Sequence, residues 1–236
     1  MAALQISNPG RDHLERLRVF ASESFCQITR RTSTQVEAHW MDEVTQLLQD
    51  DNTLGLIVEN DGALGGFALC SPLPWESRLL GRSMWTARFL AIDSKSKDAE
   101  SVAGSLIATL SDRLIARGAE FLLSKPSATE TVLAHALEAN GFLLMDTLVD
   151  FLYDCEKADR SGNVELPTPP GFALRLVMPG DVEPLVETAR AAFAGHCGRF
   201  HADPRLGEAA ATGLYEEWIR SCAKGWADWV YVLVKG

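Results

Sequence analysis

The sequence predicts an α/β fold, because segments with the spacing of strands alternate with segments with the spacing of helices over most of its 236 residues. The clearest strand signal is a hairpin at residues 54–70, and the clearest helix signal is an amphipathic stretch at residues 102–115. A similar order of elements begins again at residue 172. These three observations predict one complete unit followed by the opening part of a second.

The first two elements are predicted to be helices. Residues 9–30 place apolar side chains close to helical spacing, and residues 34–49 place them on one face. The apolar positions in the two stretches are Leu14, Leu17, Val19, Phe20, Phe25, Val36, Trp40, Val44, Leu47 and Leu48.

A hairpin follows the two helices. Residues 54–59 (LGLIVE) and 64–70 have the composition of strands, and the Asn-Asp-Gly sequence at 60–62 tolerates the positive φ that hairpin turns require. Residues 71–83 (SPLPWESRLLGRS) are rich in turn formers and are predicted to be a loop. Residues 84–92 are predicted to be a strand.

The next helix has the most regular apolar stripe in the chain. Gly118 terminates it, and residues 120–124 (EFLLS) are predicted to be a short buried strand. The stripe consists of Val102, Ala103, Leu106, Ile107, Leu110, Leu114 and Ile115.

Ser127 and Glu130 have the spacing of a capping box, which predicts that a helix begins there. Gly141 ends this helix, and residues 142–153 are predicted to be a long final strand of the first unit.

Residues 156–171 are polar, contain three prolines and are predicted to be a linker. Beyond them the sequence predicts a strand at 172–177, helices at 181–194 and 208–224, and a strand at 229–234.

The second segment resembles the first. Residues 8–12 (NPGRD) and 178–181 (MPGD) precede corresponding helices, and Trp40 corresponds to Trp218 in the next helix. Gly236 falls near the hairpin turn of the first copy, so roughly 90 further residues would complete the second copy. We therefore expect the native protein to continue. The alternatives are that the terminal strand pairs with the first unit, or with another chain to form a homodimer.

The bulk composition argues against two classes of partner. The formal net charge is −10 and no block of Lys or Arg occurs, so neither nucleic acid nor an anionic membrane surface is an expected partner. The five cysteines are scattered, without a C-x-x-C pair, as in cytoplasmic proteins with reduced thiols. The N-terminus lacks the features of a signal peptide and no apolar run is long enough for a membrane span, so a cytoplasmic location is predicted.

The predicted order of elements in residues 1–155 resembles the GNAT (GCN5-related N-acetyltransferase) fold, a mixed and mostly antiparallel sheet with flanking helices. Residues 73–81 (LPWESRLLG) and 137–142 (LEANGF) look like the amino-terminal half of TDP-fucosamine acetyltransferase-type proteins. Residues 193–204 (FAGHCGRFHADP) and 215–219 (YEEWI) are similar to the start of their catalytic domain.

The resemblance implies acetyl-CoA as co-substrate, normally bound by a glycine-containing loop at a helix N-terminus. In the first unit this loop corresponds to residues 93–101 (DSKSKDAES), which contain no glycine. Asp98 and Glu100 would oppose the phosphates, and Leu137 stands where the family often has the tyrosine that protonates the CoA thiolate. No cofactor-binding residue is therefore assigned, and catalytic residues are unknown.

The predicted domains are a degenerate GNAT-like module at 1–155, a linker at 156–171 and the N-terminal part of a second GNAT module at 172–236. In the family, the loop between the first two helices borders the acceptor. The resemblance therefore implies that Arg199, His201 and Asp203 bind substrate, such as an anionic nucleotide-sugar.

Two further candidates are Trp75 and Glu76, which could line a pocket in the predicted loop at 71–83. The alternative is that the aromatic ring covers the core beneath that loop.

The same interhelical segment contains two histidines, a cysteine and a carboxylate, His196, Cys197, His201 and Asp203, which are all types of zinc ligand. No second cluster supports a metal site, and polar residues are common between helices, so no metal is predicted.

By resemblance, the parent protein transfers an acetyl group from acetyl-CoA to a small-molecule primary amine, with an amino sugar as one candidate, and this chain alone is expected to be inactive. The alternative is a non-catalytic GNAT-like binding or regulatory module that recognises a ligand or a protein.

Overall fold

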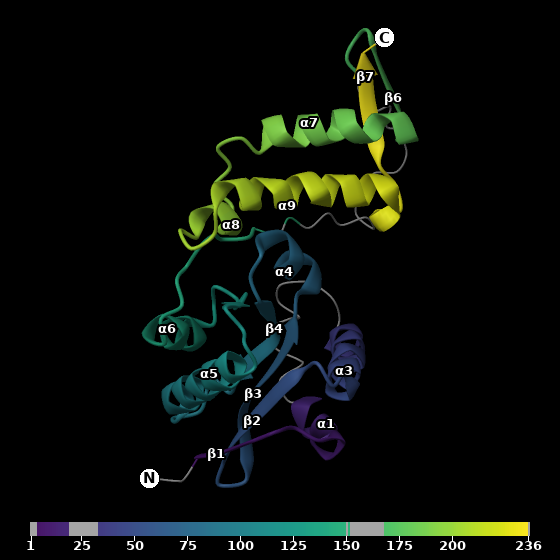
Figure 1. Cartoon of the computed structure of the whole chain (residues 1–236). Coiled ribbons are helices and arrows are strands. Elements are labelled where there is room, and N and C mark those ends of the chain that lie inside the picture. The colour runs from purple at the N-terminus through teal and green to yellow at the C-terminus, as the bar shows by residue number, and fades with distance from the viewer. Residues whose placement is uncertain (1–3, 19–32, 150, 152–167, 236) are drawn as a thin grey trace. The chain divides into compact units, whose positions relative to one another are not determined.

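The structure is a computed structural model that describes residues 4–18, 33–149, 151 and 168–235. The chain divides into two compact units, Met1–Leu144 and Met145–Gly236 (Figure 1). None of the helices in the described ranges has both the length and the apolar character needed to cross a bilayer.

The first unit is built on a five-stranded sheet with the order β1-β2-β3-β4-β5. Neighbouring strands are antiparallel except β4 and β5, which are parallel. This mixed, mostly antiparallel sheet with flanking helices is the GNAT fold, as predicted. The strands are β1 (Leu4–Ser7), β2 (Leu54–Asn60), β3 (Ala63–Pro72), β4 (Met84–Ile92) and β5 (Phe121–Leu123).

Helices cover both faces of this sheet (Figure 1). The helical segments of the unit are η1 (Arg11–His13), α1 (Leu14–Leu17), α3 (Ser33–Gln49), α4 (Pro74–Leu80), α5 (Ala99–Ala116) and α6 (Thr131–Ala139). One core contains residues from α5, α6 and one side of the sheet, and the other contains residues from α1, α3 and the opposite side.

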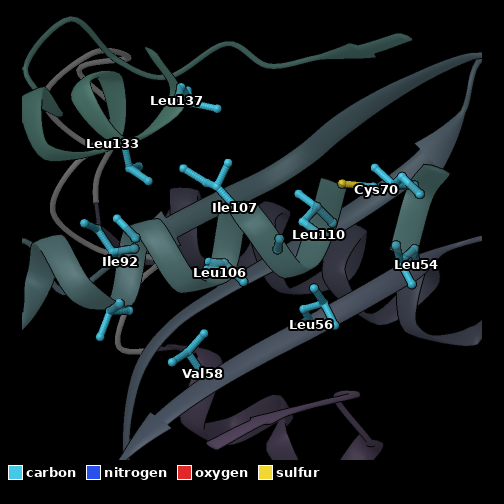
Figure 2. Close-up of a cluster of buried hydrophobic side chains, with 14 of the residues drawn as sticks. Leu54, Leu56, Val58, Cys70, Ile92, Leu106, Ile107, Leu110, Leu133 and Leu137 are labelled. Carbon is cyan, nitrogen blue, oxygen red and sulfur yellow. The ribbon is translucent and has the colours of Figure 1, made fainter. Parts of the chain in front are cut away.

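The alternation of side chains in β2 produces these two cores. Leu54, Leu56 and Val58 join the core with α5, as Figure 2 shows, whereas Ile57 joins the core with α3. All four side chains are buried, so β2 needs a covering layer on each face.

Two predictions in the middle of the first unit were wrong. Residues 71–83 are not a plain loop, because α4 begins at Pro74, where a fixed φ suits the first helical turn, and ends at Gly81, whose φ is 64°. The predicted capping box is absent, because α6 begins only at Thr131 and Ser127 instead accepts a hydrogen bond from the Thr129 amide.

The ends of the first unit also differ from the prediction. Strand β1 was missed because it has only four residues. The predicted helix at 9–30 is described only to residue 18, as η1 and α1, and its remainder lies outside the described residues.

The predicted strand at 142–153 is also wrong where the structure describes it, since residues 142–149 and 151 have no regular secondary structure; residues 150, 152 and 153 lie outside the description. An apolar sequence forms a strand only beside a partner edge, and β5 offers an edge of three residues.

The second unit contains an antiparallel strand pair and two long helices. Its elements are β6 (Phe172–Leu176), η3 (Pro179–Asp181), α7 (Val182–Ala192), α8 (Arg199–Ala202), α9 (Glu208–Ser221), η4 (Cys222–Trp226) and β7 (Tyr231–Lys235). The predicted helix at 208–224 ends as α9 at Ser221, and η4 is a π-helical turn that ends around Gly225, whose φ is 115°.

The two units share an order of elements. In the described residues, the order β1-η1-α1-α3-β2 recurs as β6-η3-α7-α9-β7 when the short segments α8 and η4 are left out, and the two strands pair antiparallel in both cases.

Candidate functional site

The second unit contains a group of aromatic and charged side chains that we call the Tyr215 cluster. Its members are Asp146, Phe193, His196, Arg199, His201 and Tyr215. The segment between α7 and α9 supplies the histidines and the arginine, and α9 supplies the tyrosine.

Three rings of the cluster are stacked. The Tyr215 ring lies between those of Phe193 and His201, with centroid distances of 4.2 and 5.5 Å and interplanar angles of 22° and 17°. His196 meets the Tyr215 ring edge-on at 5.5 Å. This stacking restricts the tyrosine and directs its hydroxyl toward a fixed position.

Gly198 permits a close approach within the cluster. A Cβ at position 198 would lie 2.5 Å from His196 Nε2 and 2.8 Å from the Tyr215 hydroxyl. Only glycine therefore leaves room for both of these polar groups beside the backbone where α8 begins.

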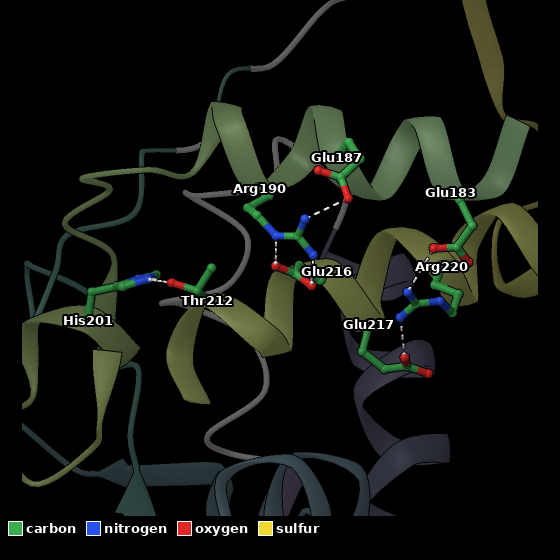
Figure 3. A network of polar contacts seen from close by, with 8 residues as sticks. All are labelled: Glu183, Glu187, Arg190, His201, Thr212, Glu216, Glu217 and Arg220. Carbon is green, nitrogen blue, oxygen red and sulfur yellow. Dashed lines mark hydrogen bonds and ion pairs between the residues drawn. The ribbon is translucent and has the colours of Figure 1, made fainter. Parts of the chain in front are cut away.

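Two buried nitrogens of the cluster have no hydrogen-bond partner among the described residues. They are Nε of Arg199 and Nδ1 of His201. The remaining contacts fix both side chains: Arg199 Nη1 lies 3.8 Å from Asp146, and His201 Nε2 lies 3.3 Å from the Thr212 hydroxyl (Figure 3). A buried polar group without a partner costs about 1–3 kcal/mol, so a ligand that accepts from Arg199 Nε and forms a hydrogen bond with His201 Nδ1 would bind favourably.

The hydroxyl of Tyr215 is held in its neutral form. Burial raises the pKa of Tyr215, and the Asp146 carboxylate adds to this increase, while Arg199 acts in the opposite direction. At neutral pH the side chain therefore keeps a proton that it can donate to a ligand.

The structure brings together only part of the predicted site. Arg199 and His201 belong to the cluster, but Asp203 forms a pair with Arg205, whose Nε lies 2.8 Å from Oδ1, and is only 4% exposed. This pair lowers the pKa of Asp203 and closes the turn before α9. Trp75 and Glu76 lie in the first turn of α4, partly exposed, in the other unit.

The predicted site did not include Tyr215 or Asp146. Tyr215 was noted only as part of the YEEWI sequence, and the five-residue spacing between His196 and His201 gave no sign that both rings would meet it. No three side chains of metal-ligand type come together in the described part of the chain.

The turn before α5, where a CoA loop was expected, is closed by its own contacts. The amides of Asp93, Ser96 and Ala99 donate to carbonyl oxygens of Gly65, Asp93 and Ser96 at 2.8–3.1 Å. Asp98 precedes the helix and accepts a hydrogen bond from Asn60 at 2.7 Å. These amides are already occupied, and a carboxylate stands at the positive end of the helix, so the turn is a poor phosphate site.

Comparison of the sequence with known proteins gives a curated relative of low identity. No protein-family model matches the chain. A spore coat polysaccharide biosynthesis protein, SpsD of Bacillus subtilis (strain 168), is 26% identical over 179 residues, which are 73% of this chain and 55% of SpsD. The chain thus spans about half the length of this curated relative.

Solved structures are similar in fold at low sequence identity. A transcriptional regulator from Bacillus halodurans has a TM-score of 0.50 and 13% identity, with 64% of this chain and 100% of that chain covered. The aminoglycoside N-acetyltransferase AAC(6')-Iy in complex with CoA has a TM-score of 0.47 and 20% identity, with 66% and 97% covered.

Proposed function

We propose that this chain is part of a GNAT-type N-acetyltransferase, in which acetyl-CoA supplies the acetyl group and a primary amine on a small molecule accepts it. The fold of the first unit supports the reaction class. The name of the relative SpsD, a polysaccharide biosynthesis protein, supports an amino sugar as the acceptor.

The Tyr215 cluster is the acceptor-binding site in this proposal, and the unpartnered nitrogens of Arg199 and His201 are the observation that carries it. A permanent cation suits a phosphate or carboxylate of the acceptor, because Arg forms charge-assisted hydrogen bonds with anions. The Tyr215 hydroxyl and the exposed His196 ring suit sugar hydroxyls. An anionic nucleotide-sugar has both kinds of group.

The first unit acts as a non-catalytic module. The occupied amides and the Asp98 carboxylate before α5 support this assignment, because CoA phosphates would have to displace contacts that the turn already makes. We further propose that residues 172–236 are the N-terminal part of a second module, joined to residues 1–155 by a linker at 156–171. The repeated order of elements supports this division.

Calorimetric titration of the purified chain with a nucleotide diphosphate amino sugar tests the acceptor site. Loss of one charge-assisted hydrogen bond costs about 1.5–3 kcal/mol, so Arg199→Ala should weaken binding by roughly 10- to 150-fold. Lys224→Ala, which removes an exposed cation outside the cluster, is the control and should leave the affinity unchanged. If the original chain and Arg199→Ala bind the nucleotide diphosphate amino sugar with equal affinity, the Tyr215 cluster is not the acceptor-binding site.

Turnover tests the role of the first unit. The purified chain should release no CoA from acetyl-CoA when amines are supplied, and measurable release would contradict the assignment of the first unit as non-catalytic.

A second candidate function is a non-catalytic binding module, which the closed turn before α5 favours. The two functions differ in the native protein isolated from its source cells. An acetyltransferase releases CoA when acetyl-CoA and an amine are supplied together, whereas a binding module binds its ligand and releases no CoA.

A further inference from the structure

One face of the β6–β7 strand pair is exposed over its whole length and is apolar except at Lys235. Leu174 pairs with Leu233, Leu176 pairs with Tyr231, and the Val177 amide bonds to the Val230 carbonyl at 2.9 Å, which continues the pairing. Alternate residues of both strands therefore lie on this face. The apolar ones are Phe172, Leu174, Leu176, Met178, Trp229, Tyr231 and Leu233, and their exposure runs from 39% at Phe172 to 74% at Trp229. The exposed Lys235, which pairs with Phe172, lies at one end of the same face.

The opposite face of the same strand pair is covered only in part, since Val232 is buried but Ala173 is exposed. Val232 is 6% exposed, and its partner Arg175 forms an ion pair with Asp181 in η3. The strand pair therefore has one partly covered face and one face on which seven apolar side chains are exposed to solvent. Contiguous exposed apolar surface of this kind marks a binding surface.

The first unit shows what covers the corresponding face. Ile57 pairs with Ser7 and is buried on the side of α3, just as Val232 pairs with Arg175 on the covered side of β7. The other side of β1 and β2 packs against α5. The residues on that side are Leu4, Ile6, Leu54, Leu56 and Val58.

We infer that the apolar face of β6–β7 binds an amphipathic α-helix with an apolar stripe like that of α5. The inference rests on the repeated order of elements and on the exposed face, and it does not depend on the acetyltransferase activity. The stripe of α5 that covers the first unit includes Val102, Leu106 and Leu110, all buried.

The dimensions of the face fit one helix. Two strands about 4.8 Å apart with their side chains present a strip about as wide as the roughly 10 Å diameter of a helix. Seven residues of strand extend about 23 Å, which a helix of about 15 residues would span. An isolated two-stranded pair is only marginally stable in water, so such a helix would also stabilise the strands.

A graft tests this inference on the complete chain. Residues 61–126 of the same protein, which contain β3, β4, α5 and β5, are added after Gly236, so that they follow β7 as they follow β2 in the first unit. Amide hydrogen exchange is then measured for β6 and β7. We expect exchange in both strands to slow by at least tenfold. A matched graft that carries Leu106→Glu and Leu110→Glu in the added helix should give no protection.

Two results would overturn the inference. One is equal exchange in β6 and β7 with the intact stripe and with the Glu-substituted stripe. The other is evidence that a second copy of the chain covers this face. Light scattering would then show that the ungrafted chain is a dimer and that Leu233→Glu dissociates it. The control Ile115→Glu, which changes an exposed apolar residue of the first unit, would leave the dimer intact.

Discussion

The strand pairs β1–β2 and β6–β7 arise from the same order of elements but lie in different environments. In the first unit both faces of β2 are buried, and two hydrophobic clusters fill the space beneath the helices. In the second unit only Val232 of the strand pair is buried. A strand-helix-helix-strand segment thus covers one face of its own strands, and the other face needs a further layer.

The helices of the two units are also held in different ways. α5 is held by a long stripe of buried apolar side chains. α7 and α9 bury fewer, Val186, Ala189, Ala211 and Leu214, and ion pairs lie within and between these two helices at their surfaces (Figure 3). Arg190 contacts Glu187 and Glu216, and Arg220 contacts Glu183 and Glu217. Exposed ion pairs contribute little to stability, so the second unit should unfold more easily than the first.

The largest expected effect is a difference in the free energy of unfolding when the same Leu→Ala substitution is made in β2 and in β7. Leu56→Ala removes a fully buried side chain and should lower the free energy of unfolding of the first unit by about 2–5 kcal/mol. Leu233→Ala removes a half-exposed side chain and should cost less than about 1 kcal/mol. Urea unfolding, monitored by hydrogen exchange of peptides from each unit, measures both values.

Similar costs for the two substitutions would contradict the comparison. They would mean that Leu233 is already covered in solution, by a second copy or by another segment of the chain.

The sequence predicted the fold well where a local pattern determines the structure. The strand at 84–92 and the helix with the Val102–Leu114 stripe were correct because alternation and four-residue spacing are local properties. The prediction for residues 142–149 was wrong because a strand also needs a partner edge of sufficient length, which no local pattern reveals. Arg199 and His201 were identified through family resemblance, but their contact with Tyr215 depends on how α8 and α9 pack, which the sequence does not display.

A smaller effect is expected at Gly198, which lies against other side chains, whereas Gly213 in α9 does not. Gly198→Ala would press a methyl group against His196 and the Tyr215 hydroxyl, which the stacked rings hold in place. We expect a loss of about 1 kcal/mol or slightly more in stability, and weaker acceptor binding by calorimetry.

Gly213→Ala in α9 is the matched control for Gly198→Ala. No atom lies within 4 Å of its added methyl group, and alanine favours helix, so it should stabilise the second unit by up to about 1 kcal/mol. If both substitutions shift the melting temperature in the same direction, the close approach at Gly198 has no energetic consequence.

The smallest expected effect is the loss of thermal stability when an acidic residue is neutralised, at Asp181 in η3 or at Asp12 in η1. Hydrogen bonds from Arg175, and then from the Met178 amide, lower the pKa of Asp181 from 3.8 to about 2. Because the folded pKa is below the unfolded one, the carboxylate stabilises the second unit above about pH 4, and this contribution disappears as the pH falls toward 2. Asp181→Asn should therefore lower the thermal stability of the second unit at pH 7, and the difference from the original chain should vanish near pH 2.

Asp12→Asn in η1 is the control for this titration, because the Asp12 side chain is 82% exposed and lies 3.1 Å from a histidine nitrogen, that of His13, where Asp181 has the guanidinium of Arg175. It should change stability less than Asp181→Asn at pH 7, as measured by thermal unfolding of both variants across the same pH range. If the loss in Asp181→Asn persists unchanged at pH 2, it arises from the geometry of the turn at Met178 and not from the charge of the carboxylate.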